Sequence, residues 1–403
     1  MENNLEKFYR ESNFIFESYG CTCSIDEKTM SDKTKTKSLV IFPNKDQKIK
    51  LAYQPKYGLV KVSEKNGATT DKDVLSELLS INEKDLKGYK KFFEKYGFLF
   101  TIDKEYLKIE EEELIYIVNR LKLSTELLSQ ISESQRKNYS IITKIAYSLI
   151  NNKSLEIKDI NYSSCPHALL QKNLNHRHGM RQIPRKYIDA DKHLIAVSDY
   201  GYGEYIFDEE ILSGYIRSSG YDKDVGGLVY ALEINSLSAY VNYIDAPYKE
   251  RILIEFFYHT FHRTRGLTSY KYETSKLNDG EMNLSKLDNE FKKTALEAAK
   301  IILSEEISHY IKNIHPVYDS ITMGAAWQVD SLISALYYSL FFINPNNQIV
   351  RRCANINCNR HVYFSVPRTS SKKIYCTPEC CRNVQQRKHR EKKIKLTQNE
   401  ASN

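Results

Sequence analysis

The sequence predicts an α+β fold, in which a helix-dominated body is followed by a small C-terminal module built around clustered cysteines. Long segments with apolar residues at helical spacing, short apolar runs between residues 37 and 62, and five of the eight cysteines within residues 353–381 support this prediction. Hydrophobic residues make up 41% and charged residues 27% of the chain, which excludes wholly disordered and wholly coiled-coil proteins. At about 150 residues per domain, 403 residues suggest two to three domains.

The N-terminal 110 residues are predicted to form an α+β region. Apolar residues from Leu5 to Phe16 suggest a short helix over residues 1–20. Three short strands follow, at Ser38–Phe42, Ile49–Tyr53 and Leu59–Val62, separated by turn residues. Residues 71–100 have helical spacing and reach a predicted C-cap at Gly97.

The next region, residues 111–345, is predicted to be mainly helical. Two helices are expected within 109–152, and long helices at 247–265, 285–315 and 318–343, with a β-leaning insert at about 187–244. The loop Asn344–Asn347 is the expected boundary to a cysteine module at 346–396, which a tail at 397–403 follows.

Targeting and membrane signals favour a cytoplasmic protein that does not enter a membrane. Met1–Lys7 has no basic stretch followed by an apolar one, as a secretory signal would. The longest apolar segment, Ala325–Ile343, contains Gln328 and Asp330, which favours a buried helix over a membrane span. In a reducing compartment, clustered cysteines indicate metal binding more readily than disulfides.

The positive charge of the chain is concentrated near its C-terminus. Residues 348–396 contain 13 Lys and Arg against two acidic residues, a net charge of +11, whereas the whole chain carries +8. Residues 1–347 are therefore close to neutral overall. Such a cluster is typical of a polyanion-binding module.

The cysteine spacing predicts one structural zinc ion. Cys353 and Cys358 form one short pair, and 17 residues separate it from Cys376, which pairs with Cys380 or Cys381. Two such pairs can supply four thiolates to a tetrahedral Zn²⁺ about 2.3 Å from each sulfur. Adjacent residues at a helix start point about 100° apart, so one of Cys380 and Cys381 is expected to bind.

The module is expected to resemble a treble clef, with a hairpin between the pairs and a basic helix after them. The predicted hairpin joins Val362–Phe364 to Ile374–Tyr375, and the predicted helix covers Pro378–Lys395. The basic residues of both elements are candidate nucleic-acid contacts. They are Arg368, Lys372, Lys373, Arg382, Arg387, Lys388, Arg390, Lys392 and Lys393.

Residues 353–395 resemble the CGNR zinc finger, the C-terminal module of a family of bacterial transcription-regulator-like proteins. The resemblance rests on both cysteine pairs, on Phe364 and Tyr375, and on the basic residues that flank Cys376. It includes Cys381 with Asn383, while Arg382 and Val384 stand where the family has Gly and Arg. The family spacing favours Cys381 as the fourth ligand, and the register of the basic helix favours Cys380. The resemblance implies a DNA-binding regulator.

The predicted function is therefore zinc-dependent nucleic-acid binding, to DNA rather than RNA, with a homo-oligomer as a further expectation. Two alternatives stay open: a nuclease-like effector enzyme directed to nucleic acid, and an interaction scaffold with a purely structural zinc. No linear catalytic motif is present, so no catalytic residue is predicted.

Two weaker clusters bear on the enzyme alternative. Cys165 and His167 lie close in sequence to His176 and His178, and these four side chains are of types that could bind a metal ion. A second set, Glu255, His259 and His262, would share one face of a helix. Isolated histidines in polar loops are more often solvated than functional.

Overall fold

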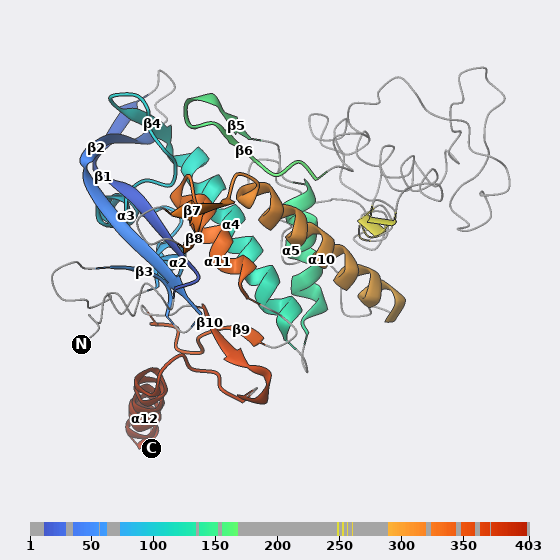
Figure 1. Cartoon of the computed structure of the whole chain (residues 1–403). Coiled ribbons are helices and arrows are strands. Elements are labelled where there is room, and N and C mark those ends of the chain that lie inside the picture. The colour runs from blue at the N-terminus through green and yellow to red at the C-terminus, as the bar shows by residue number, and fades with distance from the viewer. Residues whose placement is uncertain are drawn as a thin grey trace, which may run out of the picture. The chain divides into compact units, whose positions relative to one another are not determined.

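The structure is a computed structural model, a mixed assembly of helices and small antiparallel sheets (Figure 1). It describes residues 12–29, 35–55, 57–62, 73–133, 137–151, 155–167, 248–249, 252–253, 256, 260, 289–319, 324–343, 348–358, 363–370 and 372–400. Two compact units are present. Unit 1 comprises Met1–Arg136, Glu156–Tyr162 and Ile307–Asn403, and unit 2 comprises Lys137–Leu155 and Ser163–Glu306.

The central sheet of unit 1 is built on a long antiparallel hairpin. Strand β1 (Phe14–Thr29) pairs with β2 (Lys35–Gln54), and the other edge of β2 pairs with β3 (Gly58–Lys61) at one end and β4 (Leu107–Glu110) at the other. The pairing shifts register between Tyr19 and Gly20. At this point the buried positions of β1 change from Phe14, Phe16 and Ser18 to Cys21 and Cys23, as expected for a bulge.

The predicted helix over residues 1–20 is wrong for the part that the structure describes. Residues 14–20 belong to β1, in which Phe14 and Phe16 are buried and Ile15 is exposed. This alternation is the period of a strand with one buried face. The strands predicted at 38–42 and 49–53 are confirmed, but they are parts of one continuous β2.

The helices predicted within residues 71–100 are confirmed as α2 (Val74–Ser80) and α3 (Leu86–Tyr96). The side chains of Asp73 and Asp85 cap them by accepting hydrogen bonds from the backbone of Ser76 and Gly88. Helix α3 packs on β1, where the Cys21 thiol lies 3.2 Å from the Phe93 carbonyl oxygen.

Gly97 ends α3 at a φ of 86° and a ψ of 169°, a conformation that is close to glycine-specific. A Cβ at this position would meet the Ser18 Oγ and lie 2.5 Å from the Tyr19 carbonyl oxygen. Gly97→Ala is therefore expected to lower the free energy of unfolding by about 1–3 kcal/mol, which urea denaturation measures. An unchanged unfolding midpoint would contradict this close packing of α3 on β1.

The remaining helices of unit 1 complete its core. Helix α4 (Glu111–Ser132) follows β4 directly, and α11 (Leu332–Phe341) packs on β1 and β3. The Phe14 and Tyr338 rings lie 4.8 Å apart, and the Tyr53 and Phe342 rings 5.4 Å apart. These contacts join the N-terminal strands to residues 338–342 in one aromatic core.

The single helix predicted at 318–343 is wrong over its first half. Strands β7 (His315–Asp319) and β8 (Gly324–Gln328) form a hairpin there, and α11 begins after Ser331, whose side chain caps it. Asp330 and Ser331 interrupt the apolar run, and a side-chain oxygen just before Leu332 favours a new helix start.

Unit 2 contains α5 (Tyr139–Asn151) and most of α10 (Asn289–Ile311), so the helices predicted in these ranges are confirmed. In unit 1, the short strand β5 (Glu156–Ile157) and a 3-10 turn at Lys158–Ile160 precede β6 (Tyr162–Ser163), at which the chain enters unit 2 again. The β-leaning insert and the boundary loop Asn344–Asn347 lie outside the described residues, and of the helix expected at 247–265 single helical positions are described. Among the helices that are described, none is long and apolar enough to cross a membrane.

Candidate metal centre

The C-terminal cysteines are positioned by a β-hairpin. Strand β9 (Gln348–Arg352) pairs antiparallel with β10 (Tyr363–Pro367), which places Cys353 directly after β9. The predicted pairing of 362–364 with 374–375 is wrong. The observed hairpin buries Ile349, Val350 and Val366 to 2% exposure or less, whereas Ile374 is 47% exposed.

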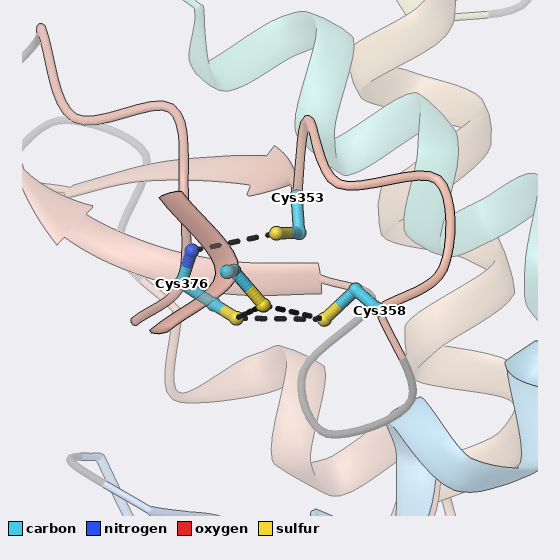
Figure 2. Close-up of side chains that lie close together, drawn as sticks. Cys353, Cys358 and Cys376 are labelled. Atoms are coloured by element: carbon cyan, nitrogen blue, oxygen red, sulfur yellow. Dashed lines mark hydrogen bonds between the residues drawn. The ribbon is translucent and has the colours of Figure 1, made fainter. Parts of the chain in front are cut away.

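Four thiols converge beside this hairpin (Figure 2). Their sulfur atoms all lie within 4.8 Å of one another, and they belong to Cys353, Cys358, Cys376 and Cys380. The Cys376 sulfur lies 3.4 Å from that of Cys358 and 3.5 Å from that of Cys380. Tetrahedral ligands about 2.3 Å from a zinc ion would be about 3.8 Å apart. The cluster therefore has the size of a four-thiolate metal site.

The choice between Cys380 and Cys381 follows from the start of helix α12 (Pro378–Glu400). The Thr377 hydroxyl accepts a hydrogen bond from the Cys380 backbone, and Pro378 occupies the first helical position, which proline favours. In this register Cys380 is buried within the cluster, and Cys381 is half-buried and lies outside it.

The environment acts differently on the individual thiols. Burial raises the pKa of Cys353 and of Cys376. Burial also acts to raise the pKa of Cys380, but hydrogen bonds from Asn355 and Thr377 outweigh it and lower this pKa to about 7. Four adjacent thiolates would repel one another, and a bound divalent cation removes that repulsion.

The hairpin is attached to helix α4 by polar contacts. The Ser129 hydroxyl donates to the Val350 carbonyl at 2.9 Å, and the Tyr363 hydroxyl donates to the Glu126 carboxylate. The Arg351 guanidinium donates to both carboxylate oxygens of Glu133, at 2.9 and 2.8 Å. The cysteine cluster therefore has a fixed support in unit 1.

Arg351→Lys is expected to loosen this support although it keeps the charge. A lysine ammonium cannot reproduce the two parallel bonds of a guanidinium, so a loss of about 1–2 kcal/mol is expected. Hydrogen exchange of the β9 amides measures it. Arg352→Lys on the exposed neighbouring side chain is the control, and equal exchange in both variants would argue against this contact.

The predicted nucleic-acid residues fall into two groups. Arg368 donates to the Ser132 carbonyl of α4 at 3.4 Å, and the Lys373 ammonium lies 5.9 Å from the centre of the Phe364 ring of β10. Arg368, Lys372 and Lys373, which form this first group, are all exposed. The second group lies on α12, where Arg387 is half-buried and the side chain of Lys393 is outside the described residues. Its exposed members are Arg382, Lys388, Arg390 and Lys392.

A second cluster of possible metal ligands lies in unit 2, and the sequence predicted two of its three members. Cys165 and His167 meet Glu306 of α10, with their ligand atoms within 4.8 Å of one another. Glu306 was missed, although it follows the buried Ala298 and Ile302 at intervals of four and so falls in the apolar stripe of the helix. The other predicted residues, His176, His178, Glu255, His259 and His262, lie outside the described residues.

Comparison of the chain with protein-family models, with curated proteins and with solved structures finds no match. The resemblance of residues 353–395 to the CGNR zinc finger therefore stays a prediction. The four-cysteine cluster, which could hold a metal ion, rests on the geometry of the chain itself.

Proposed function

We propose that residues 348–400 form a zinc-dependent nucleic-acid-binding module, in which the four cysteines hold one structural Zn²⁺ and helix α12 contacts the phosphates of DNA. In this proposal the chain acts as a transcription-regulator-like protein. The observation that carries it is the exposure of the basic turns of α12 directly beyond the cysteine cluster.

Helix α12 is anchored at its start and exposed beyond it. Cys380 and Val384 are buried, and from Gln385 to Lys392 the described side chains are exposed apart from the half-buried Arg387. Figure 1 shows the helix leading away from β9 and β10 to the C-terminus. A helical segment whose described side chains are mostly exposed gains little stability from packing, so its surface is available for a partner.

The distribution of charge on α12 favours a partner that surrounds the helix. Successive residues of an α-helix point about 100° apart, so Lys388 and Arg390 lie on nearly opposite sides of the helix. Lys388 and Lys392 are four residues apart, and like charges at this spacing destabilise a free helix. Phosphates on both sides of a groove would relieve this repulsion.

The size and shape of helix α12 favour duplex DNA over duplex RNA as its partner. The 23 residues of α12 correspond to a length of about 35 Å. The major groove of B-DNA, about 12 Å wide, admits an α-helix, whereas that of A-form RNA is too narrow for side chains to read.

The proposal is tested by titrating labelled duplex DNA and duplex RNA of the same sequence with the zinc-loaded full-length chain at several salt concentrations. DNA is expected to bind more tightly, with an affinity that falls linearly with salt on logarithmic axes at about 0.9 per phosphate contact. Binding to neither duplex at low salt would overturn the proposal and favour a scaffold with a purely structural metal.

A further inference from the structure

A second metal-ligand cluster is buried in unit 2, remote in sequence from the C-terminal cysteines. Cys165 and His167 belong to the segment after β6, and Glu305 and Glu306 to helix α10. Cys165 is 7%, His167 3% and Glu306 0% exposed. Burial this deep is costly for ionisable groups unless charges balance.

The imidazole of His167 lies between two carboxylates. Its Nδ1 is 2.7 Å from a Glu305 oxygen, and its Nε2 is 2.8 Å from a Glu306 oxygen. A neutral imidazole has a single N–H, so it can donate to one of the two carboxylates and not to both. The contact between Nε2 and Glu306 therefore needs either a proton, carried by the imidazole or by the carboxyl group, or a metal ion bound at Nε2.

The position of Cys165 favours the metal ion. Its sulfur lies within 4.8 Å of the His167 nitrogen and the Glu306 oxygen. Thiolate, imidazole and carboxylate are all ligands of Zn²⁺, whereas an ion pair of imidazolium and carboxylate involves only two of these three groups. One thiolate and one carboxylate balance the charge of a divalent ion, so the ion and its three buried ligands would be neutral together, with the partly exposed Glu305 carboxylate outside them.

We propose that Cys165, Nε2 of His167 and Glu306 bind one Zn²⁺, with Glu305 as a positioning residue that accepts the Nδ1 proton of His167. A carboxylate on the other ring nitrogen is the usual partner of a metal-bound histidine. The ion takes the place of the proton between Nε2 and Glu306. Tetrahedral ligands about 2.0–2.1 Å from zinc lie about 3.3 Å apart, so these two atoms separate by about 0.5 Å.

This site differs in kind from the C-terminal cluster. Four thiolates close a tetrahedral structural site, whereas the described residues of unit 2 supply three ligands. Three protein ligands and one exchangeable position are the arrangement of zinc sites that bind water or substrate. The inference is independent of nucleic-acid binding by α12.

The test is the zinc content of the purified full-length chain. The wild type is expected to hold two zinc ions per chain, Cys380→Ser one, and Cys380→Ser combined with His167→Gln none. One zinc per chain in the wild type and none in Cys380→Ser would overturn the proposal, and this comparison does not require any variant of unit 2 to fold.

Substitutions of the two glutamates test the assigned roles in the Cys380→Ser background. Glu306→Gln removes a ligand and is expected to abolish the remaining zinc, whereas Glu305→Gln is expected to weaken its binding about 10–100-fold. Cobalt substitution should give a sulfur-to-cobalt absorption band that is lost in Cys165→Ser. His315→Gln on the exposed strand β7 is the control. Unchanged zinc affinity in both glutamate variants would contradict the site.

Discussion

Replacing Cys380 by Ser is expected to remove the metal of the C-terminal cluster, whereas replacing Cys381 by Ser is expected to leave it bound. The Cys380 sulfur lies 3.5 Å from that of Cys376 and 3.7 Å from that of Cys358. Loss of one of four ligands should weaken metal binding by more than the roughly 10–100-fold that loss of an outer partner costs. Competition with a chromogenic chelator measures the affinity.

Cys381→Ser is a matched control, because it makes the same substitution one residue further along α12. The zinc content should fall by one ion per chain in Cys380→Ser and stay at the wild-type value in Cys381→Ser. The reverse result would mean that α12 begins in a different register from the one observed, with Cys381 turned towards the cluster.

Neutralising four charges of α12 is expected to reduce DNA affinity more than any other surface change. The variant replaces Arg387, Lys388, Arg390 and Lys392 by Gln, and it leaves the four cluster cysteines in place. Each phosphate contact contributes about 0.9 to the slope of affinity against salt, so the slope should fall by up to about 3.6. Anisotropy titrations at several salt concentrations give both values.

The control for this variant changes the charge equally at another surface. Lys45, Lys84, Lys87 and Lys91 are exposed in the N-terminal part of unit 1, and their replacement by Gln removes the same four charges. The zinc content of both variants should equal that of the wild type. Equal losses of affinity would mean that net charge, and not α12, determines binding.

The local sequence was sufficient to predict a helix where the residues at its ends signal its start or its stop. Helix α3 has the Asp85 cap, an apolar stripe and Gly97 at its end; the helical spacing and the end at Gly97 were predicted, whereas the separation of α2 from α3 was not. For residues 14–20 the same reasoning gave the wrong element. Several aromatic residues in a short window fit helical and strand periods almost equally, and the pairing with β2 that decides between them is not local.

Spacing predicted the C-terminal cluster because chelating pairs are a short-range pattern. Spacing did not decide whether Cys380 or Cys381 is the fourth ligand, because that depends on the residue at which α12 begins. It also missed the pairing of β9 with β10, in which β9 packs on α4 and the Tyr363 hydroxyl of β10 reaches Glu126 of the same helix. Glu306 was missed because its partners, Cys165 and His167, are about 140 residues earlier in the chain.

We propose that helix α12, held at its start by the cysteine cluster, binds nucleic acid. The most direct test compares the full-length chain with a chain that ends at Gln386, both zinc-loaded, in anisotropy titrations of labelled duplex DNA at two salt concentrations. The shorter chain keeps Cys380, Val384 and both strands of the hairpin, so its zinc content should be unchanged. We expect salt-dependent binding by the full-length chain and loss of this binding in the shorter one. Equal affinity of the two chains, or no binding by the full-length chain at low salt, would contradict it.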